Sequence, residues 1–220
     1  MTRLQRTSPI YGQIQSLTGK WQTLNDMPVL TACLDEQARL SHLGIADLSC
    51  LARFGVKGAS AADWLHSQGL PTPDRPNSWL DLPEGGLIAR LGLTEFLIED
   101  SIQSTIAASL SQACQSPPAK VYPVLRQDLA LALWGEAVPD LLRQTCNINF
   151  AALTLSDRPV VLTSMIGVAV TVIPNQRSDR PFYRIWCDGT FGTYVWRTLL
   201  AIAEELGGGA VGTDAFLKID

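Results

Sequence analysis

Apolar and polar residues alternate in a short segment, FGVKGASAADWL (54–65), which then changes to a helical pattern. Phe54 and Val56 have the period-two spacing of a half-buried strand. Gly58 permits a tight exit from that strand, and Ser60 is a typical residue to cap the first turn of a helix. The segment therefore predicts a strand, a glycine turn and a helix in succession.

The same pattern returns further along the chain, in LALWGEAVPDLL (131–142). Gly135 takes the place of Gly58, and Pro139 stands early enough in the second helix to be tolerated there. Few residues are identical, but both segments predict a β-turn-α corner. This similarity indicates an internal repeat.

Strand patterns and then an amphipathic helix follow each corner. The helices are predicted over 101–114 and 189–209, where apolar residues recur every three to four positions. Antiparallel strands that alternate with covering helices are typical of an α+β layer fold. We therefore predict an α+β fold of two related β-α-β-β-α halves, with variable numbers of extra strands.

The proline-rich stretch QSPPAKVYP (115–123) is the predicted connector between the halves. We expect an N-terminal extension over 1–34, made of loops and one short strand. A first α+β half is expected over 35–115 and a second over 116–220. The chain length suits one bilobed domain built from these halves.

Charge and composition exclude several classes of function. Lys and Arg number 17 against 21 Asp and Glu, and no basic run is present, so nucleic acid is not an expected partner. The longest apolar stretch, at 160–173, contains Thr, Ser and Gly and is too short to cross a bilayer. The first residues lack the apolar core of a secretory signal. We expect a globular cytoplasmic protein that binds neither nucleic acid nor membrane.

The sequence lacks the usual motifs for metal, phosphate or nucleophilic chemistry. Its five cysteines form no C-x-x-C pair, and two histidines are too few for most metal sites. The cysteines are predicted to be small buried residues, and no glycine-rich phosphate-binding pattern occurs. Three neighbouring carboxylate pairs are predicted to lie on the solvated surface. They are Asp81 with Glu84, Glu99 with Asp100, and Glu204 with Glu205.

Charged and aromatic residues cluster around the polar stretch PNQRSDRP (174–181). Arginines beside aromatic rings are common where proteins meet, and they also suit anionic ligands. The alternative is a solvated loop that leads into an ordinary core strand. The candidate ligand-binding or partner-binding residues are Arg177, Asp179, Arg180, Tyr183 and Trp186.

Three segments, in the same order, resemble the glycine-cleavage T-protein superfamily. GIADLSCLARFGVKGASAADWLHSQG is similar to its opening module, QDLALALWGEAVPDLL to a central segment, and YVWRTLLAIAEELGGGAVGTDAFLKID to its close. Within the superfamily, the short length and RTSPIYG near the start most resemble the gamma subunit of heterotetrameric sarcosine oxidase. The resemblance implies a folate-binding-domain-like α+β fold.

Residues expected to do chemistry in that superfamily are replaced here. Its acidic GGxxDDLxV run corresponds to GGLIARLGLTEFLIE, with Ala89 and Arg90 in place of carboxylates. Its GYTGExGFE segment, which supplies a pteridine-binding acid, corresponds to IPNQRSDRPFYRI, and Cys50 replaces the histidine of DLSH. The KGCYxGQE run of relatives in tRNA modification and iron–sulfur repair does not occur. The departures imply a scaffold that has lost its pocket chemistry.

The resemblance therefore implies a noncatalytic accessory subunit of a sarcosine-oxidase-like, multisubunit amine oxidase in one-carbon metabolism. Its partners would be larger, flavin-containing oxidase subunits, and this chain alone would bind no cofactor. Two alternatives stay open: a tetrahydrofolate-dependent one-carbon (aminomethyl) transferase that uses Asp179, and a stand-alone folate-binding regulator. Partner contacts are expected around Arg177 to Trp186 and along an apolar N-terminal segment. That segment comprises Ile10, Tyr11, Ile14, Leu17 and Trp21.

Overall fold

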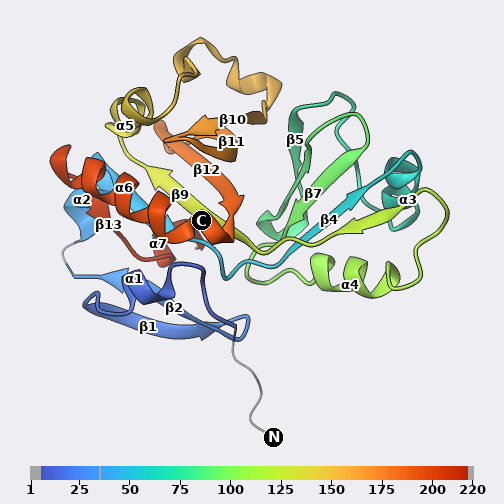
Figure 1. Ribbon diagram of the computed structural model, residues 1–220, viewed down its shortest axis with the longest axis horizontal. Coiled ribbons are helices and arrows are strands. Elements are labelled where there is room, and N and C mark those ends of the chain that lie inside the picture. The colour runs from blue at the N-terminus through green and yellow to red at the C-terminus, as the bar shows by residue number, and fades with distance from the viewer. Residues whose placement is uncertain (1–5, 35, 218–220) are drawn as a thin grey trace, which may run out of the picture. The chain divides into compact units, whose positions relative to one another are not determined.

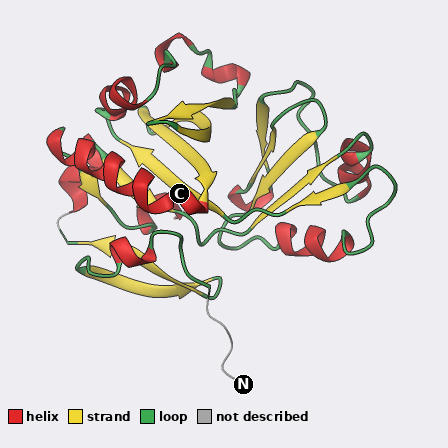
Figure 2. Cartoon of the chain, viewed as in Figure 1, coloured by secondary structure: helices red, strands yellow, loops and turns green. Residues whose placement is uncertain are grey.

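The computed structural model describes residues 6–34 and 36–217, which divide into two compact units (Figure 1 and Figure 2). Unit 1 contains residues up to 50, together with 128–155 and those from 162 onward. Unit 2 contains 51–127 and 156–161. Both units combine β-sheet with helices, so the predicted α+β class is confirmed.

A six-stranded sheet forms the framework of unit 1. In spatial order its strands are β10 (Val161–Met165), β11 (Val168–Arg177), β12 (Arg180–Asp188), β9 (Asp128–Trp134), β3 (Gly44–Asp47) and β13 (Gly209–Ala210). β13 runs parallel to β3, whereas β11, β12, β9 and β3 pair antiparallel. β9 lies between two neighbours and its central residues are all buried, which its nearly continuous apolar sequence predicts.

Helices of unit 1 pack against this sheet. α6 (Gly192–Glu205) contacts β3 and β13, and α5 (Val138–Thr145) contacts β12 and α6. The packing buries one stripe of α6, including Val195, Trp196 and Leu199. The predicted helix over 189–209 is confirmed in its central part. The remaining short helices of this unit are α2 (Glu36–His42), η2 (Phe150–Ala152), η4 (Gly189–Phe191) and α7 (Asp214–Leu217).

The segment before residue 35 forms a helical turn and a β-hairpin. Its elements are α1 (Tyr11–Ile14), β1 (Gly19–Leu24) and β2 (Met27–Cys33). Asn25 and Asp26 both have positive φ and form the two-residue turn between the strands. The prediction of loops with one short strand is wrong, because it neglects this Asn-Asp turn signal.

Unit 2 contains a five-stranded antiparallel sheet. In spatial order its strands are β5 (Ser78–Asp81), β6 (Leu87–Arg90), β7 (Glu95–Glu99), β4 (Arg53–Lys57) and β8 (Tyr122–Val124). One face packs with α3 (Ala61–Ser67) and α4 (Ile106–Ala113) around a core that includes Val56, Phe96 and Leu110. η1 (Pro83–Gly85) and η3 (Leu155–Asp157) complete the helical segments. Within 6–34 and 36–217, no helix has the length and apolar content to cross a membrane.

Both glycine corners have the same backbone geometry. The φ angle is +125° at Gly58 and +126° at Gly135, in a region that favours glycine. A carbonyl oxygen also occupies the place where a side chain would begin: that of Lys120 at Gly58 and that of His42 at Gly135. Glycine is therefore required at both corners by conformation and by space.

The predicted side-chain cap at Ser60 is wrong, because its hydroxyl makes no capping hydrogen bond. Its backbone N–H instead donates to the carbonyl of Lys120 over 3.2 Å. Ala137, at the corresponding place in the second corner, donates its N–H to the carbonyl of His42 over 3.0 Å. Main-chain bonds from another segment thus begin both corner helices.

Strands also pair across the two halves of the sequence. β3 precedes β4 in the chain but pairs with β9, and β8 precedes β9 but pairs with β4. The element order is β4-α3-β5-β6-β7-α4 in one part and β9-α5-β10-β11-β12-α6 in the other, with three strands after each corner helix. The compact units are consequently not contiguous stretches of sequence.

Candidate functional site

The polar stretch 174–181 forms the end of a β-hairpin, so its prediction as a loop is wrong. β11 continues to Arg177, which pairs with Arg180 at the start of β12. Ser178 and Asp179 connect the strands with φ angles of +50° and +59°, the left-handed pair of a two-residue hairpin turn. Asp179 and Arg180 are exposed, whereas Arg177 is half-buried.

The strand register separates the candidate binding residues. Arg177 pairs with Arg180, and Thr171 pairs with Trp186, which places Arg177, Arg180 and Trp186 on one face of the hairpin. Tyr183 lies on the opposite face, because side chains alternate along a strand. The structure brings three of the five candidates to one face, leaves Asp179 at the turn and directs Tyr183 away.

Arg177 holds α7 against the sheet. Its guanidinium lies 5.5 Å from the ring centroid of Trp134, a distance suited to a cation–π contact. Its Nη1 donates to the carbonyl of Phe216 over 3.2 Å. The rings of Phe182 and Phe216 stack nearby, with centroids 6.0 Å apart. Arg177 therefore has a structural role whatever else contacts this face.

Tyr183 is a core residue. Its side chain is buried, and its ring meets that of Phe150 edge-on at a centroid distance of 5.5 Å. Burial raises the pKa of Tyr183 above its ordinary value of 10.0. Trp186 is also buried, with 3% of its surface exposed. Neither ring is positioned to meet a partner directly.

The apolar N-terminal segment is divided between core and surface. Ile10 and Ile14 are 0% and 3% exposed, so the prediction that they contact a partner is wrong. Tyr11 and Trp21 are half-buried and meet edge-on, with ring centroids 6.2 Å apart. Tyr11, Leu17 and Trp21 are the members of this segment that keep exposed surface.

The positions that carry acids in the superfamily motif are part of the scaffold here. Ala89 is fully buried within β6. Arg90 donates through Nη1 to the carbonyls of Pro73 and Asp74, over 3.0 and 2.9 Å, and through Nη2 to that of Leu93 over 2.7 Å. Its guanidinium thus joins two loops of unit 2 through their backbone carbonyls, at a position where the superfamily motif has a carboxylate.

The cysteines are free, and four of the five are buried, as predicted. Cys50 is 1% exposed and is therefore no accessible nucleophile. Burial, with smaller contributions from the charges of Asp128 and Asp188, raises the pKa of Cys187 to about 11. Among the residues that the structure describes, no three His, Cys, Asp or Glu side chains form a group that could hold a metal ion.

Glu99 and Asp100 are buried, so the prediction that this pair lies on the solvated surface is wrong. Glu99 is 0% exposed and accepts a 3.2 Å hydrogen bond from the Nη1 of Arg53. Asp100 accepts hydrogen bonds from the N–H of Ala107 and the hydroxyl of Ser104, and so caps the N-terminus of α4. Both carboxylates stabilise the fold of unit 2.

The other two pairs include surface groups, as predicted. Asp81 forms an exposed ion pair with Arg158 at 2.8 Å, and the Glu84 side chain lies outside the described part of the chain. Glu204 and Glu205 are exposed at the end of α6. None of these contacts places two carboxylates together for acid–base chemistry.

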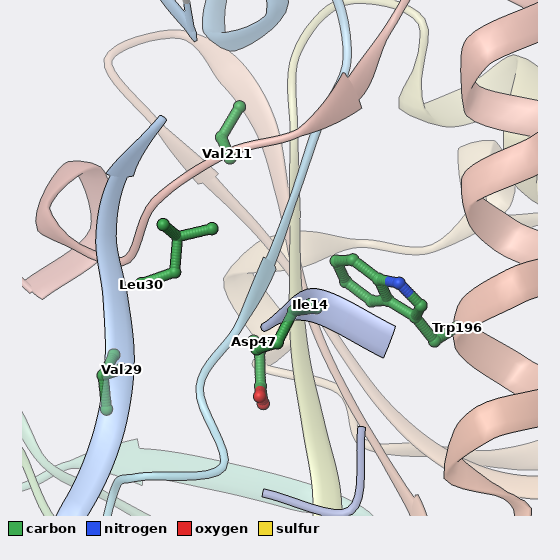
Figure 3. Close-up of a pocket in the computed structure, with 6 residues that line it drawn as sticks. All are labelled: Ile14, Val29, Leu30, Asp47, Trp196 and Val211. Atoms are coloured by element: carbon green, nitrogen blue, oxygen red, sulfur yellow. The ribbon is translucent and has the colours of Figure 1, made fainter. Parts of the chain in front are cut away.

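A pocket in unit 1 was not anticipated from the sequence (Figure 3). The space within it, including the part open to solvent, is about 260 Å³. Asp47 is its one ionisable lining residue among those described, and the Asp47 carboxylate accepts the N–H of Ser49 over 2.9 Å. The other described lining residues carry no ionisable group, so the described walls supply no second acid or base. The lining residues are Ile14, Val29, Leu30, Asp47, Trp196 and Val211.

Comparison with solved structures shows that the chain has the fold of the T-protein superfamily, and so confirms the resemblance at the level of fold. One match is the glycine cleavage system aminomethyltransferase T of Bartonella henselae, with a TM-score of 0.75 and 14% identity. The alignment covers 96% of this chain and 61% of the aminomethyltransferase chain. Another is heterotetrameric sarcosine oxidase of Corynebacterium sp. U-96, solved with pyrrole 2-carboxylate, with a TM-score of 0.65 and 18% identity.

These two known chains are covered by the present chain to different extents. The chain covers about three fifths of the aminomethyltransferase, whereas 93% of it aligns with 97% of the sarcosine oxidase chain. No protein-family model matches the sequence, and no curated protein sequence matches it. At these identities the likeness establishes the fold, while activity depends on the site.

Proposed function

We propose that this protein is a noncatalytic accessory subunit of a sarcosine-oxidase-like, multisubunit amine oxidase. The observation that carries the proposal is coverage: the fold accounts for 97% of a chain of heterotetrameric sarcosine oxidase. The same fold spans 61% of the aminomethyltransferase chain. Larger flavin-containing subunits are the proposed partners, and the cytoplasm is the proposed location.

The chemistry of the replaced positions supports an accessory role. Arg90 is committed to loop carbonyls, and Ala89 and Cys50 are buried. The ionisable groups in the interior of unit 2 are hydrogen-bonded within the fold, as with Asp100 and Glu99. A charged group whose hydrogen-bond capacity is used inside the fold has little of it left to offer a substrate.

Co-purification tests the proposal. The tagged chain is co-expressed with candidate flavin-containing oxidase subunits of the same organism and recovered by affinity. We expect a stable complex with flavin absorbance near that of the oxidase, and no flavin on the chain purified alone. Stoichiometric flavin on the isolated chain, its turnover of a methylated amine, or failure to recover any flavoprotein would contradict the proposal.

A charge reversal locates the partner surface. Arg180 is exposed on the arginine-bearing face of the β11–β12 hairpin, and Arg197 is an exposed arginine of α6. If the hairpin face binds the oxidase subunits, Arg180→Glu lowers recovery of the complex and Arg197→Glu does not. Equal recovery from both variants would place the interface elsewhere.

Tetrahydrofolate-dependent aminomethyl transfer is the second candidate, because 96% of the chain fits the aminomethyltransferase fold. Calorimetric titration with tetrahydrofolate distinguishes it. Micromolar binding that Asp179→Ala abolishes and the exposed control Asp74→Ala preserves would favour a transferase site. Binding without transfer of a one-carbon unit would favour a stand-alone folate-binding regulator instead.

A further inference from the structure

His42, the last residue of α2, holds both ring nitrogens against oxygen acceptors. Nδ1 lies 3.0 Å from Oε1 of Glu136, and Nε2 lies 2.7 Å from the carbonyl oxygen of Leu206. A backbone carbonyl and an ionised carboxylate can only accept hydrogen bonds. A neutral imidazole has one N–H and satisfies one of these contacts, whereas the imidazolium has two and satisfies both.

Three segments of unit 1 meet at this residue. Glu136 belongs to the turn that begins α5, and Leu206 is the C-terminal cap of α6. The main-chain carbonyl of His42 also accepts the N–H of Ala137 over 3.0 Å. Directly after Leu206 the chain turns at Gly207 and enters β13, which pairs with β3. The ring therefore connects α2, the second glycine corner and the joint between α6 and β13.

The charges around the ring favour a proton on it. Glu136 is the charged side chain within hydrogen-bond distance among the described residues. Arg39, one turn earlier on α2, directs its Nη1 to the carbonyl of Ala210 over 3.1 Å. Glu204 and Glu205 stand in the last turn of α6, where the negative end of the helix dipole also lies. The hydrogen bonds to Glu136 and Leu206 raise the pKa of His42 above its ordinary value of 6.5.

We propose that His42 is a pH-dependent clamp, which as imidazolium joins α2 to both the second glycine corner and the end of α6, and which gives up one of these contacts on losing its proton. The clamp is formed well below pH 6.5, where the ring carries its proton, and weakens as pH rises through the folded-state pKa, because a raised pKa means that the folded state binds the proton more tightly. This inference does not depend on the oxidase proposal.

Nitrogen-15 NMR of the imidazole rings tests the charge on His42. The chain has two histidines, so the signals can be assigned with His42→Gln, and His66, whose ring contacts Thr72, is an internal reference. At pH 6.5 an unperturbed imidazole is about half protonated. We expect His42 to be more than half protonated there. Half protonation or less would overturn the proposal.

Variants at two glutamates identify the cause. Glu136→Gln keeps an oxygen acceptor near Nδ1 but removes the charge, whereas Glu205→Gln removes the same charge from an exposed position at the end of α6. We expect Glu136→Gln to move the His42 titration to lower pH, and Glu205→Gln to move it much less. Equal shifts would show a general charge effect and no specific pair.

Hydrogen exchange tests the clamp itself. Gly208 donates its N–H to Ala203 and Gly209 donates to Leu43, so both amides report on the joint between α6 and β13. After correction for intrinsic rates, their protection should fall several-fold as His42 loses its proton, relative to Ile185 in β12. In His42→Gln this pH dependence should disappear. Protection that stays constant in the wild-type chain would contradict the clamp even if the ring titrates at high pH.

Discussion

Replacing Gly135 by alanine should destabilise unit 1, because both the backbone conformation and the space at this corner require glycine. The φ of +126° is costly for a residue with a side chain, by about 1–3 kcal/mol. The new Cβ would also overlap the carbonyl oxygen of His42, so the turn must shift. That shift lengthens the 3.0 Å bond from Ala137 to His42, worth about 1 kcal/mol. The expected loss in the free energy of unfolding is about 2–4 kcal/mol.

Two glycines of the same unit separate the strain from the overlap. Gly167 has a φ of +82° and no heavy atom within 4 Å of an added Cβ, so Gly167→Ala should cost about 1–2 kcal/mol. Gly12 lies in α1 with the same free space and no positive φ, so Gly12→Ala should be neutral or stabilise by up to about 1 kcal/mol. Urea titrations followed by tryptophan fluorescence and far-ultraviolet circular dichroism measure all three.

The ranking, more than any single value, tests the corner geometry. If the substitution at Gly135 costs no more than that at Gly167, the His42 carbonyl does not constrain the turn. If Gly135 and Gly12 variants unfold at the same urea concentration, the positive φ itself is refuted. Gly58→Ala, which meets the carbonyl of Lys120, should repeat the Gly135 result in unit 2.

Three further predictions concern buried polar groups. Asp100→Ala removes the cap of α4 and should lower the free energy of unfolding in urea by about 2–3 kcal/mol. Thr105→Ala should lower it by under about 0.5 kcal/mol, because Thr105 makes no side-chain cap. Equal costs would refute the cap. Arg90→Ala should cost about 2 kcal/mol and make loop 71–77 cleavable by protease, and an uncleaved loop would show that the guanidinium does not hold it. Burial raises the pKa of Cys187 from 9.0 to about 11, so at pH 8 its thiol should be about a hundredfold less ionised than an ordinary cysteine thiol. A thiol reagent should therefore label it slowly in the native state, and rapid labelling would contradict its burial.

Local patterns in the sequence were sufficient for the two glycine corners, for the helix within 189–209 and for the fold class. Period-two apolar residues followed by glycine predicted both corners, and the apolar stripe of α6 predicted the helix that contacts β3. Residues that depend on distant partners were not predicted. Glu99 looks like a solvated strand end until Arg53 is placed beside it, 46 positions away in sequence. Similarly, only the register of β11 and β12 shows that Arg177 lies on the same face as Arg180 and Trp186.

The two compact units also depend on contacts between residues that are far apart in the sequence. A strand that precedes each corner lies against the corner strand of the other half, with β3 on β9 and β8 on β4. The carbonyls that meet the corner glycines come from just before these exchanged strands, at His42 and Lys120. Each corner therefore needs a segment from the other half to satisfy its first helical N–H and to fill the space beside its glycine. A chain divided between residues 115 and 119 would leave the first half without Lys120 or β8 and the second without His42 or β3, so the glycine pattern that predicts each corner cannot by itself complete it.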